Sequence, residues 1–267
     1  MEKGSVKILL MRHAESVYNR FQSDFAKEHG THPKFEMFEN RWVINEQIID
    51  ALLSPTGVTQ CLDAGKQIPE KHPSVKYVIS SPMRRALLTG LHSFKEYPTP
   101  IEYTIEPWAR EILLSQCDIG YHAIDLLKQH PEIDSSVLKN DRLWFLDYYV
   151  DNPEQNYAPR LREAYAKAPK IETVVNFFRE NFPHLESYSQ MHARTHRLKQ
   201  SLAKFIANKQ AAGVTVGDGE IVLVAHSKIL RYFIGGFDEH GEQVHGKEEL
   251  KNTQIIEFDF DYAKYLN

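Results

Sequence analysis

Cysteine is scarce in this sequence: the 267 residues include only Cys61 and Cys117. Two cysteines are too few for the disulfide framework of a small secreted protein, and neither stands in a Cys-x-x-Cys pair or a zinc-ligand spacing. A chain of this length buries a substantial core without disulfides or a structural metal. We therefore expect both residues to be reduced thiols in a cytoplasmic protein.

Long apolar runs are absent as well. A membrane span requires about 18 consecutive apolar residues, and no run approaches that length. The apolar stretch over residues 6–11 is followed at once by Arg12, which is too early for the core of a signal peptide. The start Met1-Glu2 is not a myristoylation signal. These absences predict a globular protein without a membrane partner.

An excess of positive charge is also absent. The chain has 32 lysines and arginines against 36 aspartates and glutamates, a net charge of −4. This mild acidity excludes a dedicated nucleic-acid binder, although it is compatible with a basic pocket. The length fits one or two domains of roughly 150 residues each. Because no repeat or low-complexity tract divides the chain, we expect a single α/β domain over residues 1–267.

Short apolar runs predict strands, and helical patterns follow most of them. The predicted strands are residues 6–11, 77–80, 101–105, 221–225 and 254–260. Ser54-Pro55 and Ser81-Pro82 each place a capping hydroxyl before a proline, which is typical of a helix start, and Pro69 should stop the first of these helices. Gly30 should end a helix that starts at residue 17, and residues 188–209 should form a helix that covers the sheet.

Alternating strands and helices predict a three-layer α/β sandwich, in which a mostly parallel central sheet is flanked by helices. Two regions fit this alternation poorly, residues 31–49 and 119–170, and they carry aromatic residues such as Trp42 and Trp144. We predict that both are cap insertions beside the sheet. The alternative for their aromatic side chains is an ordinary satellite core.

Charged and ionisable residues stand at four predicted strand ends, where ligands bind in open α/β sheets. They are listed in chain order: Arg12-His13, Arg84-Arg85, Glu111 and His226. A transferring phosphoryl group spreads negative charge over three oxygens, and arginine forks and helix N-termini stabilise that charge. A neutral histidine can attack phosphorus, and a neighbouring arginine helps to keep it neutral. A carboxylic acid such as Glu111 can protonate the leaving oxygen.

These residues lie in segments that resemble the histidine phosphatase superfamily, which is also called phosphoglycerate mutase-like. Met11-Arg12-His13-Ala14-Glu15-Ser16-Val17-Tyr18-Asn19 resembles its Arg-His-Gly motif, and Arg110-Glu111-Ile112 resembles its Leu-x-Glu proton donor. Three further segments match in order: Asp50 to Gly57, Ser81-Pro82-Met83-Arg84-Arg85-Ala86 with Thr89, and Val224-Ala225-His226-Ser227. The match covers roughly residues 5–115 and 185–260.

The resemblance implies a role for each matching residue. His13 would be the nucleophile that becomes phosphorylated, and Glu111 would be the general acid. The implied phosphate pocket consists of Arg12, Asn19, Arg85 and His226. The register selects Arg85 rather than Arg84, because only Arg85 lies three residues after Pro82 and directly before Ala86.

The sequence also departs from the family pattern. Ala14 replaces the glycine of the first motif, and Ser227-Lys228 replaces the usual glycines after the second histidine. The His-Asp pair of the acid-phosphatase and phytase branch is absent, which favours Glu111 as the acid. The Gly-Trp-x-Asp and Tyr-Asp-x-Pro-Pro-Pro segments of glycolytic mutases are absent too, which favours a phosphatase over a mutase.

The sequence thus predicts a phosphomonoesterase that works through a phosphohistidine and needs no metal or organic cofactor. Its expected partner is a small phosphorylated substrate or a phosphoprotein. One alternative is a phosphomutase, in which the phosphohistidine returns its group to a second substrate. The other is a non-catalytic phosphate-binding or scaffolding protein. The sequence makes no prediction of the oligomeric state.

Overall fold

The computed structural model describes residues 4–30, 46–149, 157–181, 186–238, 240, 242–244 and 249–266. The strands in these residues are β1 (Ser5–Arg12), β2 (Tyr77–Ser80), β3 (Glu102–Ile105), β4 (Ile221–Ala225) and β5 (Ile255–Asp261). They form one sheet in the order β3-β2-β4-β1-β5. Only β5 runs antiparallel to its neighbour. The predicted mostly parallel sheet is confirmed.

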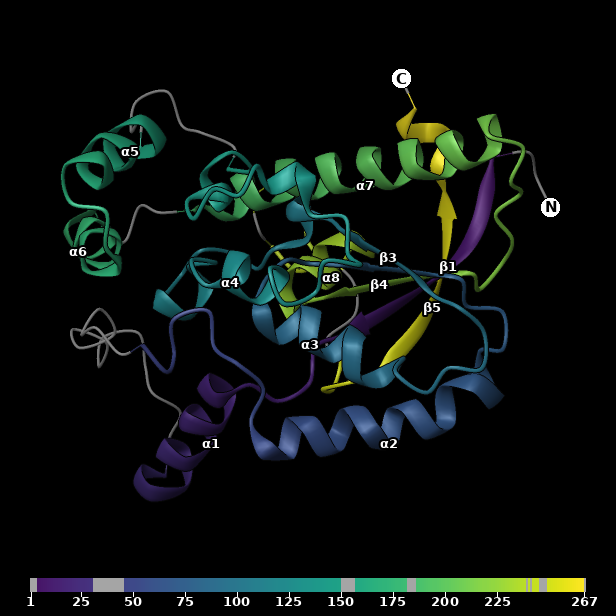
Figure 1. Cartoon of the computed structure of the whole chain (residues 1–267), viewed down its shortest axis with the longest axis horizontal. Helices are drawn as coiled ribbons and strands as arrows, with labels where there is room; N and C mark the ends of the chain where they lie inside the picture. Colours follow the sequence, from purple (N-terminus) through teal and green to yellow (C-terminus); the bar gives the residue numbers. More distant parts are fainter. Residues whose placement is uncertain are drawn as a thin grey trace.

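Helices lie on both faces of this sheet (Figure 1). They are α1 (Val17–His29), α2 (Pro55–Lys71), α3 (Arg84–Ser93), α4 (Ala123–Leu127), α5 (Tyr157–Lys167), α6 (Ile171–Asn181), α7 (Tyr188–Ala211) and α8 (Ser227–Phe233). In the view of Figure 1, α7 runs along one side of the sheet and α2 along the other. The three-layer α/β sandwich is therefore also confirmed.

The alternation of β1 side chains shows how the layers are joined. Ile8 and Leu10 belong to a buried cluster with α7 and α8. Leu9 and Met11 point to the opposite face, into a cluster that includes side chains of α2 and α3. The central strands are covered on both faces, as parallel strands usually are, and this explains their continuous apolar runs.

Two predicted helix boundaries are wrong. Pro69 does not stop α2, which continues to Lys71; a proline removes only the hydrogen bond to the carbonyl four residues earlier, so the last turn persists. The helix after Ser81-Pro82 begins only at Arg84. The Arg84 N–H donates to Asp50 Oδ1 at 2.9 Å, so a side chain 34 residues away takes the capping role.

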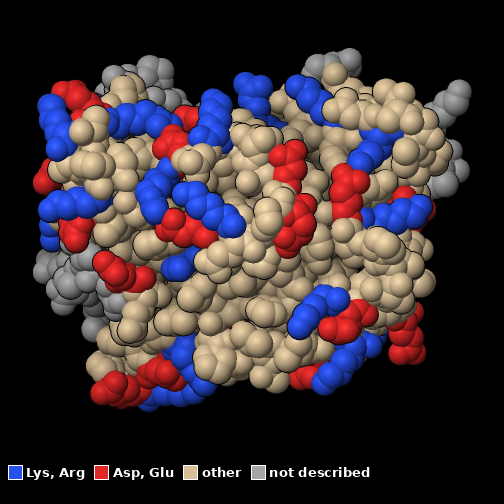
Figure 2. Space-filling view, viewed as in Figure 1, with Lys and Arg blue, Asp and Glu red and all other residues tan. Residues whose placement is uncertain are grey.

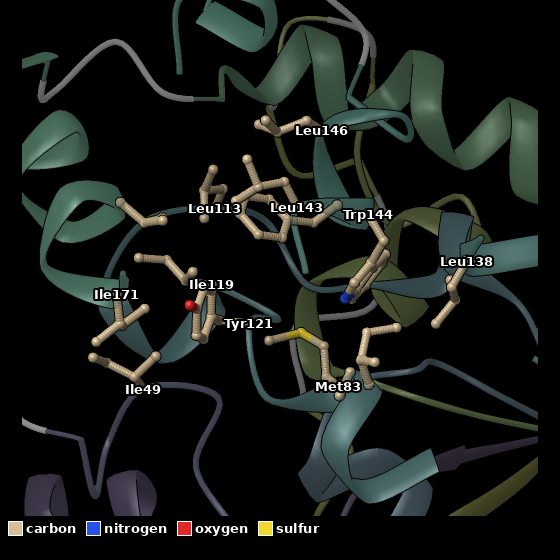
Figure 3. Close-up of a cluster of buried hydrophobic side chains, with 14 of the residues drawn as sticks. Ile49, Met83, Leu113, Ile119, Tyr121, Leu138, Leu143, Trp144, Leu146 and Ile171 are labelled. Atoms are coloured by element: carbon tan, nitrogen blue, oxygen red, sulfur yellow. The ribbon is translucent and has the colours of Figure 1, made fainter. Parts of the chain in front are cut away.

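A further apolar cluster lies beyond the sheet and contains much of the described part of residues 119–170 (Figure 3). Trp144 packs over Gly120, where a Cβ atom would lie 2.3 Å from the indole ring. Met83 and Leu113 join the same cluster, so it anchors the chain just before Arg84 and just after Glu111. Most of the predicted 31–49 insertion, including Trp42, lies outside the described residues, and the division into a domain with caps stays a prediction.

Figure 2 shows how charged side chains are distributed over one face of the molecule. Positive and negative side chains are interspersed there without a broad patch of one sign. None of the described helices combines the length and the hydropathy that crossing a membrane requires. Cys61 and Cys117 are both buried and form no disulfide.

Candidate active site

A cavity of about 300 Å³ opens beside the carboxyl ends of the parallel strands β1 and β4. Five of the six predicted site residues line it: Arg12, His13, Asn19, Arg85 and Glu111. The sixth, His226, is fully buried and does not line the cavity. Its ring centroid lies 5.0 Å from that of His13. The structure thus brings together side chains that are as much as 214 residues apart in the sequence.

His13 follows β1 directly, and its ring has a defined proton arrangement. Nδ1 lies 2.7 Å from the Ala14 carbonyl oxygen, which can only accept a hydrogen bond. Burial, and then the charges of Arg85 and Arg12, lower the pKa of His13 well below its ordinary value of 6.5. The imidazole is therefore neutral at pH 7, with the proton on Nδ1 and a lone pair on Nε2.

His226 is held behind His13 by Ser81. Its Nε2 lies 2.9 Å from Ser81 Oγ, while its Nδ1 is buried and has no hydrogen-bond partner among the described residues. Burial and the charge of Arg85 lower the pKa of His226 well below 6.5, so this ring is neutral as well. Buried polar atoms are usually paired, so the Nδ1 atom of His226 is an exception among the described residues.

Arg85 is presented by the first turn of α3 and is buried. Its Nη1 donates to the Cys117 carbonyl oxygen at 2.8 Å, and its Nη2 donates to Asp118 Oδ1 at 3.1 Å. Arg84 turns away from the cavity, and its Nε donates to the Asp50 carbonyl oxygen at 2.6 Å. The fork of Arg85 is thereby fixed against a carboxylate in the cavity wall.

Arg12 is the last residue of β1 and directly precedes His13. Its Nη1 donates to the Leu250 carbonyl oxygen at 2.5 Å and lies 3.5 Å from Glu249 Oε2. Its buried Nε has no hydrogen-bond partner among the described residues. The guanidinium groups of Arg12 and Arg85 therefore place two permanent positive charges in the cavity wall.

Glu111 reaches the cavity from the segment after β3. Its Oε1 accepts a hydrogen bond from the Ile112 N–H at 2.9 Å, and its Oε2 accepts one from the Lys228 N–H at 3.1 Å. Burial, and then the negative charge of Asp118, raise the pKa of Glu111 above its ordinary value. The protonated acid is thus more populated than that of a solvated glutamate. Lys228 stands where the resemblance implies a glycine, but it makes this contact through its backbone N–H. The lysine side chain therefore does not prevent the contact.

Asn19 occupies the first turn of α1. Its Oδ1 accepts hydrogen bonds from the Ser16 N–H at 3.2 Å and the Ser16 hydroxyl at 3.0 Å, which together form part of the capping box of the helix. Its Nδ2 is not used in this motif, and Asn19 is one of the residues that line the cavity. Asn19 therefore combines a helix cap with a place in the site.

The turn that carries His13 is held by two neighbouring helices. The Ala14 N–H donates to Thr89 Oγ1 at 2.9 Å, and Ala14 is fully buried with an ordinary backbone conformation. At Gly57, near the start of α2, a Cβ atom would lie 2.0 Å from the Glu15 carbonyl oxygen. These contacts explain why a small residue suffices at position 14 and why glycine is required at position 57.

Sequence reasoning assigned no role in the site to the other residues that line the cavity. They are Ser16, Tyr18, Gln22, Ile112, Leu114, Ser115, Cys117, Asp118, Ser227, Lys228 and Glu249. Of these, Asp118 is the most consequential, because it pairs with Arg85 and accepts backbone hydrogen bonds from Leu114 and Ser115. It follows neither a predicted strand nor a periodic pattern, so no local signal marked it.

No cluster of three or more metal-ligating side chains occurs in the part of the chain that the structure describes. The residues around His13 are instead two guanidinium groups, a second imidazole and carboxylates that pair with them. Such a set suits an anion with several oxygens.

Comparison with known proteins identifies the fold. No family model and no curated protein matches the chain. A mycobacterial glucosyl-3-phosphoglycerate phosphatase is similar in structure, with 18% identity, a TM-score of 0.50 and coverage of 96% of this chain and 90% of that one. The ecdysone phosphate phosphatase of Bombyx mori, solved with tungstate, has 14% identity, a TM-score of 0.50 and coverage of 94% and 88%. The predicted resemblance to the histidine phosphatase superfamily is confirmed for the fold.

Proposed function

We propose that this protein is a phosphomonoesterase that hydrolyses a phosphate ester through a phosphohistidine on His13. One observation carries the proposal: a buried neutral imidazole, with its Nε2 lone pair free, lies in a cavity lined by two guanidinium groups. A nucleophile between fixed positive charges is what transfer of a phosphoryl group requires. The phosphatases of similar fold agree with this proposal.

In the first step, Nε2 of His13 attacks phosphorus and the bond from phosphorus to the ester oxygen breaks. Arg12 and Arg85 stabilise the charge on the phosphoryl oxygens. The proton of the Glu111 carboxylic acid moves to the leaving oxygen. The Ala14 carbonyl oxygen holds Nδ1–H throughout and favours the positive charge that the ring gains.

In the second step, water attacks the phosphohistidine and the bond from phosphorus to Nε2 breaks. The Glu111 carboxylate takes a proton from this water, because a group that acts as acid in one direction serves as base in the next. The electron pair of the broken bond returns to Nε2, and inorganic phosphate leaves. His13 and Glu111 are then in their starting protonation states.

The proposed partner is a small phosphorylated molecule or a phosphoprotein, because the cavity recognises the phosphoryl end. The mild acidity and the absence of a membrane-spanning helix from the described residues support an enzyme that needs neither nucleic acid nor a membrane. The two reduced thiols support the cytoplasm as its compartment.

The test is a panel of phosphate monoesters, combined with mass-spectrometric detection of phosphate on the protein after rapid denaturation. We expect turnover and phosphate on His13. The His13→Ala variant should lose both, with a fall in rate of more than about 10³-fold. His192→Ala, which removes an exposed histidine of α7, should keep both. An active His13→Ala protein would refute the proposal.

The same experiment separates the two alternatives. Transfer of the phosphoryl group from His13 to a second substrate rather than to water would identify a phosphomutase. Saturable binding of vanadate or phosphate, with no turnover and no phosphate on His13, would identify a non-catalytic phosphate-binding protein.

A further inference from the structure

A buried ion network lies directly behind Glu111. Glu186, just before α7, accepts hydrogen bonds from Arg110 Nη1 at 2.9 Å and from Arg194 Nε at 2.7 Å. The three residues are at most 4% exposed. Burial alone would raise the pKa of Glu186, but the two arginines outweigh it and lower this pKa to about 2. The network therefore consists of one carboxylate between two guanidinium groups.

The same three side chains bind the backbone on both sides of Glu111. Arg194 Nη1 donates to the Arg110 carbonyl oxygen at 2.6 Å, and Arg110 Nη1 donates to the Glu111 carbonyl oxygen at 2.9 Å. Glu186 Oε2 accepts a hydrogen bond from the Leu113 N–H at 2.8 Å. These hydrogen bonds fix three backbone groups within residues 110–113 on the side of the segment that faces the network.

One of these contacts acts on the peptide group that orients the Glu111 side chain. The peptide between Glu111 and Ile112 has its carbonyl oxygen on Arg110 and its N–H on Glu111 Oε1. Because a peptide group is planar, fixing its oxygen also fixes the direction of its N–H. Arg110 therefore helps to hold one oxygen of the Glu111 carboxyl group, while the Lys228 N–H holds the other.

Stability alone does not account for this network. Replacing a buried ion pair by apolar residues of similar volume is often neutral or stabilising, because burial removes the charges from water. This buried network makes three hydrogen bonds to the backbone of residues 110–113, which indicates that the function requires a fixed geometry of this segment. The segment in question holds the proposed general acid.

We propose that Arg110, Glu186 and Arg194 are positioning residues that hold the Glu111 carboxyl group against the leaving oxygen of the substrate. This inference rests on the proposed function. It predicts that loosening the network impairs protonation of the leaving group and leaves phosphoryl binding intact. Esters of alcohols depend on that protonation, whereas 4-nitrophenyl phosphate, with its stable leaving group, depends on it little.

The test compares Arg110→Lys with the wild type on glycerol phosphate and on 4-nitrophenyl phosphate. Lysine keeps the charge, but its nitrogen ends one bond short of the position of Arg110 Nη1, and it lacks the second nitrogen with which Arg110 donates to Glu186 Oε1 at 3.2 Å. A displacement of about 1 Å costs up to roughly 10²-fold in rate, so we expect a 10- to 10²-fold loss of kcat on the alkyl ester and less than about threefold on the aryl ester. In a Glu111→Gln background the same change should add little, because no acid is left to position.

The matched control is Arg142→Lys, which disrupts an arginine–carboxylate pair with Asp125 away from the site. It should leave both rates unchanged. Equal losses on the two esters in Arg110→Lys, or no loss on either, would overturn the inference. If this variant fails to fold, Glu186→Gln carries the same comparison. Detection of phosphate on His13 during turnover of 4-nitrophenyl phosphate tests the proposed function separately. A failure of the proposed function is therefore distinguishable from a failure of this inference.

Discussion

The two sides of the cavity are built by different means. The phosphate side, formed by Arg12, His13 and Arg85, stands on the end of β1 and the first turn of α3. The acid side, formed by Glu111 and Asp118, stands on a segment with only short 3₁₀ turns. Regular elements fix the first side through the sheet, whereas side chains and buried charges fix the second.

This difference determines how each side should respond to substitution. A change on the phosphate side weakens the charge stabilisation that every phosphate ester needs. A change on the acid side acts through proton transfer, which matters in proportion to how poor the leaving group is. Comparing alkyl and aryl esters therefore distinguishes the two sides.

The largest selective effect is expected for Glu111→Gln. The amide keeps the shape of the side chain but cannot donate the catalytic proton, so kcat on an alkyl phosphate should fall by roughly 10²–10⁴-fold. The loss on 4-nitrophenyl phosphate should be much smaller. Steady-state kinetics on both esters measure this, and equal losses would remove Glu111 from the role of acid.

A loss that is independent of the leaving group is expected for Arg85→Lys. A lysine cannot hold the Cys117 carbonyl oxygen and a phosphate oxygen with one planar fork. We expect kcat/KM to fall by about 10²–10³-fold on alkyl and aryl esters alike. The control is Arg84→Lys, which keeps the backbone N–H bond to Asp50 and should stay within about threefold of the wild type. A loss confined to the alkyl ester would contradict the division of the cavity into two sides.

The same contrast explains what the sequence could predict. Strand ends are marked by apolar runs that stop at a polar residue, and parallel strands bring such ends to one edge of the sheet. Arg12, His13 and Arg85 were therefore predictable as neighbours. The start of α3 was not, because its cap is the distant Asp50 rather than Ser81.

On the acid side, local sequence carries little information. The bond between the Leu113 N–H and Glu186 spans 73 residues, and nothing near position 186 marks it as a partner of positions 110 and 113. Asp118 lies in a short 3₁₀ turn whose residues have no period. Such contacts are determined by tertiary packing, and the hydrophobic pattern of a single segment does not predict them.

A moderate effect on stability is expected for Gly57→Ala, which tests how α2 supports the phosphate side. The added Cβ atom would lie 2.0 Å from the Glu15 carbonyl oxygen, so α2 or the turn after His13 must shift. We expect a loss of about 1–3 kcal/mol in the free energy of unfolding, measured by urea denaturation. Gly217→Ala, where the nearest atom is 3.4 Å away, is the control. Equal stability of the two variants would show that the turn adapts freely.

The smallest effect is a shift in the pH dependence, and it tests whether the two sides communicate. Burial first, and the Asp118 charge second, raise the pKa of Glu111, so kcat/KM should fall as pH rises through this raised pKa and the acid loses its proton. Asp118→Asn removes the second cause, which lowers the pKa and moves the basic limb of the profile to lower pH. Profiles from about pH 4 to about pH 9 measure the shift, with Asp63→Asn on the exposed face of α2 as the control. An unchanged basic limb in Asp118→Asn would mean that the carboxylate paired with Arg85 acts on the phosphate side alone.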